Sequence, residues 1–92
     1  MTEKIFKFQG DIDIFTAKDK FKEVEEASLN GIEYMIIDFS EVTFLDSTGL
    51  GLLISLKQKL NQENKKIKII NSPANIRKVF EITDLLETFE ME

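Results

Sequence analysis

The sequence predicts a small α/β domain, a mainly parallel sheet with flanking helices, and two observations carry this prediction. Segments with strand-like apolar patterns alternate with segments of helical periodicity, in the order strand, helix, strand, helix, strand, helix. The chain has 92 residues, of which 42% are hydrophobic and 32% charged, a balance typical of one globular unit. We therefore expect a single domain spanning residues 1–92, with helices joining the strands as crossovers.

The first strand is expected at residues 4–9, because Phe6 and Phe8 fall on one face of a period-two pattern. Gly10 ends this strand. Residues 12–16 are then expected to form a loop whose aliphatic positions are buried.

The first helix is expected to begin after Thr16, a good N-cap residue, with Asp19 completing a capping box. It runs to Leu29, and Gly31 stops it by entering the left-handed conformation. Its inner face is expected to hold Ala17, Phe21, Val24 and Ala27 or Ser28.

The second strand, residues 34–39, is apolar at nearly every position, which is typical of a central strand covered on both faces. Residues 40–45 follow as a connection. Val42, Phe44 and Leu45 are expected to point inward from it.

The second helix is expected at residues 48–61, followed by a third strand at residues 67–71. The helix carries two apolar stripes, so it is either broadly buried or presents an additional contact surface. The stripes are Leu50, Leu53, Ile54 and the stem of Lys57, and Leu52, Leu56 and Leu60.

The third helix is expected to open with Ser72 as N-cap and Pro73 at its first position. Phe89 is expected in a short final strand, and residues 90–92 are expected to fray. The inner side of the helix is expected to hold Ala74, Ile76, Val79, Phe80 and Ile82.

Charge and composition exclude several function classes. The net charge is −5, so nucleic acid binding is disfavoured and a basic protein partner is favoured. The chain lacks cysteine, which excludes disulfides and thiolate metal sites, and it lacks histidine, the commonest general base and the commonest metal ligand. No apolar run approaches about 20 residues, and the start lacks a signal-peptide core. We therefore expect a cytoplasmic protein that does not enter membranes.

The stretch Phe44–Gly51 is the most informative part of the chain. Ser47 and Thr48 stand where the second helix begins, and Gly49 and Gly51 fall in its first turn. Glycine there costs up to about 1 kcal/mol relative to alanine, which indicates that something approaches this backbone closely.

The topology gathers acidic residues around this stretch. Loops that leave the carboxyl ends of parallel strands share one edge of the sheet, where sites form in open α/β folds. Asp11, Asp13 and Thr16 are therefore expected near Asp46 and Ser47. On residue type alone Ser47 is either a plain helix cap or a phosphate acceptor, because a helix N-terminus also favours a phosphate. Thr48 is the competing hydroxyl.

Three other sites remain open from the residues alone. Gly49 and Gly51 give a G-x-G pattern, but a nucleotide loop would need a third glycine or a following Gly-Lys-Ser/Thr. A receiver-like aspartyl phosphate at Asp38 or Asp46 would need a lysine after the third strand, where none stands. A metal site would have to use Asp11, Asp13 and Asp46.

Several segments together resemble one known family, the STAS domains of bacterial anti-sigma factor antagonists. The resemblance covers about residues 4–89, in the order and spacing of the family. It rests on Gly10-Asp11-Ile12-Asp13 running into Thr16-Ala17, on Asp38, on Phe44–Gly51, and on Asn71-Ser72-Pro73 with Val79-Phe80.

This resemblance implies a phospho-switched binding module and not an enzyme, and we expect no cofactor and no metal ion in it. In the family, an anti-sigma factor that is also a serine kinase phosphorylates the motif serine, and a phosphatase resets it. The unmodified domain binds that factor and frees the sigma factor. Ser47 matches the acceptor, and Asp13 and Asp46 match flanking acidic positions. We expect the partner to contact Asp11, Asp13, Thr16, Asp46, Thr48, Gly49, Leu50 and Gly51.

The chain departs from the family at its two ends. A first strand that usually pairs with residues 4–9 has no counterpart, and the last helix is short. We therefore expect bare sheet edges, with a weak homodimer as one consequence. The same departures keep open a STAS-type ligand-binding, nucleotide-binding or scaffold domain of another signalling complex.

Overall fold

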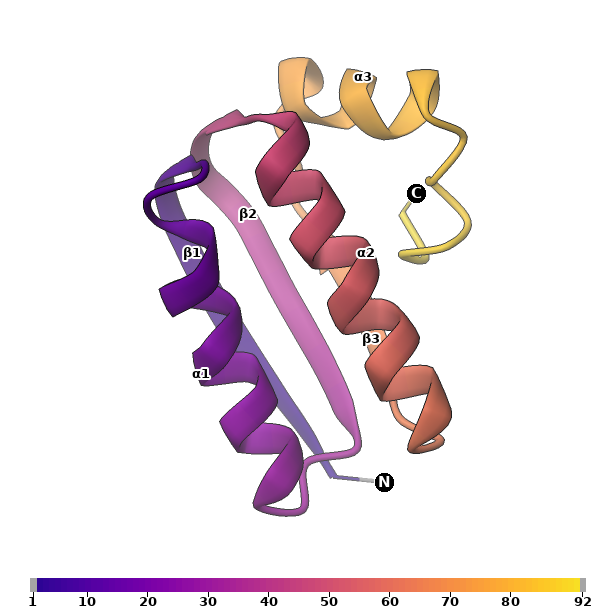
Figure 1. The fold of residues 1–92 in the computed structure, drawn as a ribbon. Helices are drawn as coiled ribbons and strands as arrows, with labels where there is room; N and C mark the ends of the chain where they lie inside the picture. The colour runs from indigo at the N-terminus through magenta and orange to yellow at the C-terminus, as the bar shows by residue number, and fades with distance from the viewer. Residues whose placement is uncertain (1, 92) are drawn as a thin grey trace.

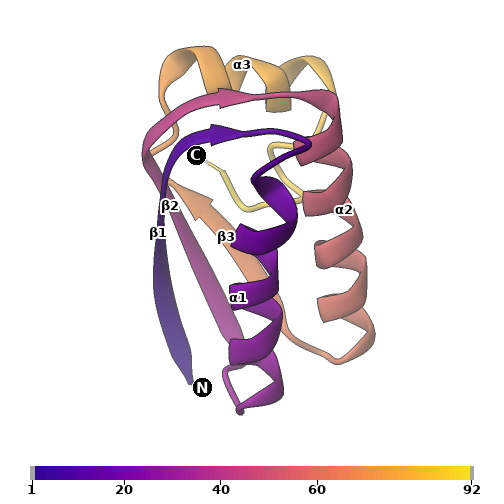
Figure 2. The same cartoon turned by 60° about the vertical axis from the view of Figure 1, so that its left-hand side comes forward.

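A three-stranded parallel sheet is the centre of the fold, with strand order β1-β2-β3. The computed structural model describes residues 2–91, so the expected domain limits at Met1 and Glu92 lie outside it. Helices α1 and α2 cover one face of the sheet, and α3 crosses above its carboxyl end (Figures 1 and 2). The elements are β1 (Glu3–Ile12), α1 (Ala17–Leu29), β2 (Tyr34–Leu45), α2 (Ser47–Gln62), β3 (Lys66–Ile70) and α3 (Ala74–Ile82). The predicted α/β class and the alternation of elements are confirmed.

Both long strands extend further than the sequence indicated. Strand β1 continues through Ile12, and β2 continues through Leu45, so the predicted loop start and connection are wrong in part. The reason is mutual pairing, since Ile12 lies opposite Leu45 in register. The register shifts beside Gly10, whose φ of +74° suits glycine at an irregularity in a strand.

Burial along β2 alternates, so the prediction of a strand covered on both faces is wrong. Met35, Ile37 and Phe39 are fully buried, whereas Ile36 and Asp38 between them are only partly buried. Helices α1 and α2 lie on one face only (Figure 2). The opposite face therefore presents apolar side chains such as Ile5, which pairs with Ile36 across the strands.

A row of phenylalanine rings ties the layers together. Phe21 of α1 lies 5.8 Å from Phe8 of β1, measured between ring centroids, and Phe8 lies 6.2 Å from Phe39. The row continues through Phe80 of α3 to Phe89, at 6.3 and 5.6 Å. Such tilted and edge-on pairs add to the burial of each ring.

The segment after α3 covers the outer edge of β3 without forming the predicted strand. The N–H of Ile69 donates to the carbonyl of Phe89 at 3.0 Å, in a turn. The fraying predicted for Glu90 and Met91 is also wrong. Met91 N–H bonds the Leu86 carbonyl at 2.8 Å, and the Glu90 carboxylate accepts the Tyr34 hydroxyl at 3.0 Å.

Edge exposure differs between the two outer strands. Within residues 2–91, β1 pairs with β2 alone, so its outer side fits the expectation of a bare edge. The edge of β3 is partly covered by Phe89, which corrects that expectation on the other side.

The start of α3 differs from its prediction. Pro73, with ψ of 155°, occupies the N-cap position, and Ser72 makes no capping bond. The Ser72 Oγ is buried and has no partner within residues 2–91. Ile76 and Phe80 form the inner face as expected, whereas Ala74 and Ile82 are exposed, because α3 crosses the end of the sheet and does not lie along it.

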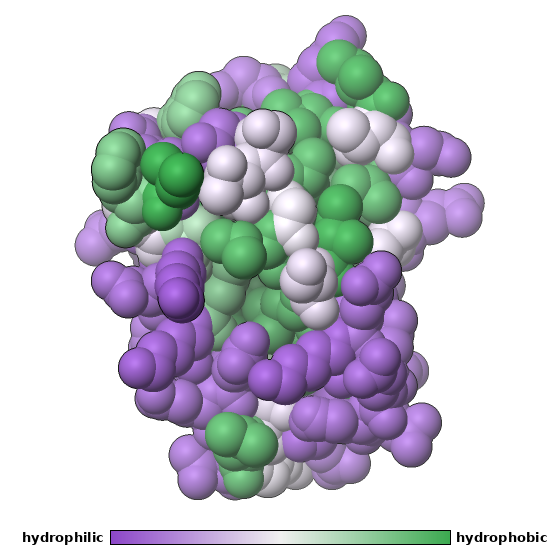
Figure 3. Space-filling model, in the orientation of Figure 1, coloured by the Kyte–Doolittle hydropathy of each residue, from purple (hydrophilic) through white to green (hydrophobic). Residues whose placement is uncertain are grey.

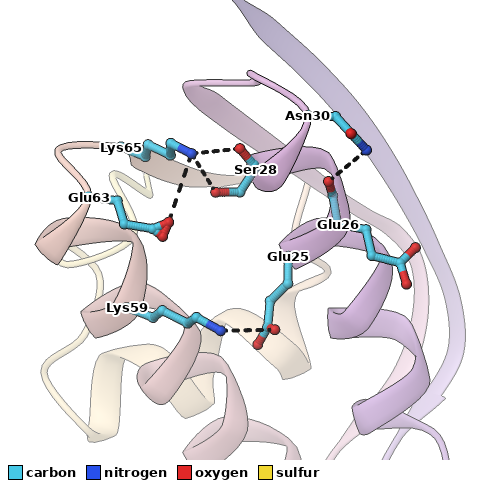
Figure 4. Close-up of polar contacts among 7 residues, drawn as sticks. All are labelled: Glu25, Glu26, Ser28, Asn30, Lys59, Glu63 and Lys65. Carbon is cyan, nitrogen blue, oxygen red and sulfur yellow. Dashed lines mark hydrogen bonds and ion pairs between the residues drawn. The ribbon is translucent and has the colours of Figure 1, made fainter.

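A polar cluster fastens the C-terminal end of α1 to the segment after α2 (Figure 4). We call Lys65, Ser28 and Glu63 the Lys65 clasp. The Lys65 ammonium donates to the Ser28 carbonyl at 2.6 Å and to its Oγ at 2.9 Å, and Glu63 lies 3.8 Å away. Nearby, Lys59 of α2 pairs with Glu25 of α1 at 3.2 Å. A cation at this end of α1 satisfies its last carbonyls and complements its dipole.

Candidate functional site

The ends of β1 and β2 bring two loops together at one corner of the sheet. Asp11 lies opposite Phe44 in the strand register, and the Asp11 carboxylate accepts the Thr43 hydroxyl at 2.9 Å. The Asp46 N–H donates to the Ile12 carbonyl at 3.2 Å. The two loops are far apart in sequence but adjacent in space (Figure 2), as the topology predicted.

Asp46, and not Ser47, caps helix α2. Its backbone is extended, with φ of −96° and ψ of 178°, and its Oδ1 accepts the Gly49 N–H at 2.8 Å. Ser47 lies next to the N-cap, as expected, but of the two roles left open for it the plain helix cap is wrong, because Asp46 makes the capping bond. A carboxylate satisfies the same orphan N–H as a hydroxyl and also complements the helix dipole.

Ser47 consequently has no capping task. It is the first helical residue, and its side chain is exposed, like that of Thr48. Its Oγ forms no hydrogen bond with any residue between 2 and 91. The first intrahelical bond runs from the Leu50 N–H to the Asp46 carbonyl at 3.0 Å, so the N–H groups of Ser47 and Thr48 point out of the helix start.

The two glycines of the motif have different tasks. A Cβ added to Gly49 would lie 2.6 Å from the Ile12 carbonyl oxygen and 3.0 Å from Leu45 Cδ1. Gly49 therefore lets α2 approach β1, which is the close approach to this backbone that the motif predicted. Gly51 is exposed with nothing within 4 Å of its Cβ position. Neither glycine lies in a loop, so the corner lacks the backbone of a nucleotide-binding loop.

Burial divides the predicted partner-contact residues. Gly49 and Leu50 are buried, with Leu50 in the hydrophobic core. Thr48, Gly51 and Asp11 are exposed. The partner contacts predicted for the residues of this corner all remain predictions.

The loop between β1 and α1 is held by its own polar side chains. Asp13 Oδ1 accepts the N–H groups of Phe15 at 2.8 Å and Thr16 at 3.1 Å. Thr16 Oγ1 donates to the Asp11 carbonyl at 2.6 Å and accepts the Asp13 N–H at 3.1 Å. The predicted capping box is wrong, since Thr16 occupies the N-cap position but makes no side-chain capping bond to α1. These bonds fix the loop, so Asp13 and Thr16 shape the corner.

Three large apolar side chains of the same corner are exposed, and for Ile14 and Phe44 the predicted burial is wrong. Phe15 is 86% exposed, Ile14 63% and Phe44 49%. Green side chains gather on the same part of the surface, over the β1–α1 loop, at the upper left of Figure 3. The sequence signal for this exposure is the pair Asp13 and Thr16, residue types that bond to the backbone of their own loop. A loop held in this way needs no buried apolar side chain to anchor it. An exposed apolar group of this kind marks an interaction surface.

The third loop of this sheet edge is tied to Asp38. Asp38 Oδ1 accepts the Ser40 N–H at 2.9 Å and the Asn71 amide at 3.4 Å. The backbone bond from Ser40 lowers the pKa of Asp38, with smaller contributions from the Ser40 hydroxyl, Asn71 and Lys7, while partial burial opposes the shift. Asp38 thus joins β2 to the end of β3.

No three carboxylates between residues 2 and 91 gather closely enough to hold a metal ion. Asp11 and Asp46 are engaged with Thr43 and with the Gly49 N–H instead. The metal site weighed from the sequence therefore lacks a geometric basis. None of the helices described is long and apolar enough to cross a bilayer.

The STAS domain model matches residues 2–92 of this chain. The chain belongs to the STAS domain family. The STAS corner, by which we mean residues 11–16 and 43–51, is the part of the domain described above. The resemblance stated from the sequence is confirmed.

Several known proteins are similar to this STAS domain. The anti-sigma-B factor antagonist of Staphylococcus aureus (strain NCTC 8325 / PS 47) is 30% identical over 79 residues, which cover 86% of this chain and 73% of the relative. The protein of the same name from Staphylococcus epidermidis is 29% identical with the same coverage. Among solved structures, the anti-sigma factor antagonist SpoIIAA in its unphosphorylated form matches with a TM-score of 0.78 at 21% identity, covering 91% of this chain and 74% of that one. Phosphorylated SpoIIAA from Bacillus matches with a TM-score of 0.71 at 23% identity, covering 90% and 76%. These two likenesses show the fold.

Proposed function

We propose that this STAS domain is an anti-sigma factor antagonist whose binding is switched by phosphorylation of Ser47. It is a binding module and not an enzyme. Unmodified, it binds an anti-sigma factor with serine kinase activity and so releases the sigma factor, and a serine phosphatase resets it. This circuit operates in the cytoplasm. The curated relatives are named for this role, and the free Ser47 hydroxyl at the start of α2 carries the proposal for this chain.

The position of Ser47 suits a phosphate acceptor. Asp46 already caps α2, so Ser47 can be modified without removing a structural hydrogen bond. The outward N–H groups of the first turn and the helix dipole favour a phosphate by roughly 0.3–2 kcal/mol. Repulsion from the Asp46 carboxylate beside it opposes the new charge. Because the favourable and unfavourable contributions offset each other, the fold is expected to survive modification.

The surroundings of Ser47 suit a protein interface. Ile14, Phe15 and Phe44 supply exposed apolar anchors, and aromatic anchors carry much of the energy in known interfaces. A phosphate adds about −1.5 to −2 charge at neutral pH. Within an interface that charge must be desolvated, which costs several kcal/mol unless a cation meets it. Since about 1.4 kcal/mol is a tenfold change in affinity, binding falls while structure is kept.

A binding experiment tests the switch. We would compare wild type, Ser47→Asp and Ser55→Asp for circular dichroism and for affinity to the cognate anti-sigma factor. Ser55 is the matched control, because it is an exposed serine on the same helix. We expect intact folds throughout, wild-type affinity for Ser55→Asp, and at least about tenfold weaker binding for Ser47→Asp. Equal affinities of Ser47→Asp and wild type contradict the proposal.

A modification experiment tests the acceptor. The domain is incubated with ATP and the anti-sigma factor, and the phosphorylated residue is located by mass spectrometry. We expect the phosphate on Ser47 in wild type and in Thr48→Ala, and no phosphate on Ser47→Ala. Modification confined to Thr48 sinks the assignment of Ser47.

A further inference from the structure

A groove of about 450 Å³ lies between α1 and α2, on the side of the molecule seen in Figure 1. Buried Phe21 of α1 and Leu56 of α2 form its floor, and Leu52 stands exposed at its α2 side. In Figure 3, green and white side chains fill the centre of this face between purple ones. The lining is therefore apolar inside a polar rim.

The rim of this groove is positive, although the chain as a whole carries −5. Lys18 and Lys22 stand on the α1 side, and neither has an ion-pair partner within residues 2–91. Glu25 is the acidic group of the lining, and it pairs with Lys59 at 3.2 Å. Two ammonium groups therefore remain uncompensated beside an apolar floor.

The end of the groove near Glu25 and Lys59 is fixed by polar contacts. Their ion pair joins the two helices, and the Lys65 clasp holds the same end of α1 (Figure 4). The helices are thus fastened at one end of the groove, which keeps its width defined. A preformed apolar cleft of this kind loses little conformational entropy when it is filled.

We propose that this groove binds an anionic amphiphile, an alkyl carboxylate whose head group meets Lys18 and Lys22 and whose chain lies on Phe21, Leu52 and Leu56. Charge complementarity selects an anion, and the apolar floor selects its chain. The volume falls within the range of small-ligand sites, about 300–1,000 Å³. A stable protein interface would need about 800 Å² and 20–30 residues from each partner, more than the two short helix segments that line the groove.

Amphiphiles that share one chain length test the two contributions separately. Decanoate, decanol and decyltrimethylammonium are titrated below their micelle concentrations, with thermal unfolding and amide NMR shifts as readouts. A ligand that binds only the folded state raises the melting temperature by mass action. We expect decanoate to stabilise the domain and shift amides of α1 and α2, decanol to act more weakly, and decyltrimethylammonium to give no stabilisation. No stabilisation by decanoate, or equal stabilisation by the cationic amphiphile, overturns the proposal.

Two double variants with the same net charge separate local from global charge. Lys18→Glu/Lys22→Glu reverses the groove rim, and Lys66→Glu/Lys78→Glu reverses two exposed lysines elsewhere. We expect the first to bind decanoate at least about tenfold more weakly and the second to bind like wild type. Equal loss of decanoate affinity in both double variants overturns the proposal, because only net charge would then matter.

The Leu52→Asp variant tests whether the groove is instead a self-association surface. Its mass and that of wild type are measured by light scattering. If the substitution changes this mass, and decanoate does not stabilise wild type, the groove is a self-association surface and the proposal fails.

Discussion

The two ends of helix α1 are built in opposite ways. At its start, Asp13 and Thr16 bond to the backbone of their own loop, and Phe15 is left outside with 86% of its surface exposed. At its end, Ser28 is buried, and Lys65, in the segment after α2, donates hydrogen bonds to it. Where polar groups bond to one another within a single loop, the apolar side chains of that loop are available for recognition. Where polar groups are shared between elements, they hold those elements together.

The largest expected effect concerns the close approach at the start of α2. We expect Gly49→Ala to destabilise the fold by about 3 kcal/mol, because the new Cβ meets the Ile12 carbonyl, a backbone atom that cannot rotate away. Gly51→Ala is the matched control, and it should be neutral or stabilising by up to about 1 kcal/mol, since its Cβ position is open. Urea unfolding of both variants measures the difference. Equal stabilities would mean that α2 does not pack against β1 as described.

The next effect compares the two ends of α1 in their contribution to partner binding. We expect Phe15→Ala to weaken binding of the anti-sigma factor by about 2 kcal/mol, roughly 30-fold, while stability stays within about 0.5 kcal/mol. Leu29→Ala is the control, because Leu29 is 78% exposed at the opposite end of the same helix. Titration calorimetry gives the affinities. A loss as large for Leu29→Ala as for Phe15→Ala would remove the distinction between the two ends.

A smaller effect is expected at the Lys65 clasp. Lys65→Met keeps the apolar stem and removes the ammonium that bonds Ser28, so we expect a loss of about 1–2 kcal/mol in the free energy of unfolding. Lys59→Met breaks a more exposed ion pair and should cost no more than about 0.5 kcal/mol. Chemical denaturation ranks the two variants, and the reverse order would refute the clasp as the main polar fastening of this end.

The smallest effect concerns Asp38, which joins β2 to the end of β3. Its pKa is lowered in the fold, chiefly by the Ser40 N–H, so it stabilises the fold above the unfolded value near pH 4. That contribution is lost as the pH falls through the lower folded pKa. We expect Asp38→Asn to cost less than about 1 kcal/mol at pH 7 and to flatten the loss of stability below pH 4. Thermal melts across pH 2–7 measure it; identical slopes for variant and wild type would contradict the assigned cause.

Local patterns predicted the elements well because periodicity reports which face of each segment is buried. The inner face of α1 and the stop at Gly31, with φ of +95°, follow from apolar spacing and from the conformational freedom of glycine. The extension of β1 and β2 could not be predicted in this way. Ile12 and Leu45 form strand because they pair with each other, and that contact spans 33 residues of sequence.

The motif shows the same division at single residues. Its residue types indicated a helix start with a hydroxyl and a close approach, and both features are present. Which residue caps the helix depended on the backbone: Asp46 is extended and faces the Gly49 N–H, so Ser47 moved into the first turn with its hydroxyl free. Which of the two glycines is approached depended on where β1 ends, because the Ile12 carbonyl at that end lies against Gly49.

The sequence by itself determined the α/β alternation, the family resemblance and the residues that meet at the STAS corner, because these depend on local pattern and strand order. Only the tertiary structure decided the directions of the side chains. Phe15 and Phe44 point outward, and Gly49 faces Ile12. Direction depends on strand register and on which polar groups the backbone satisfies, and both are set by contacts between segments distant in sequence.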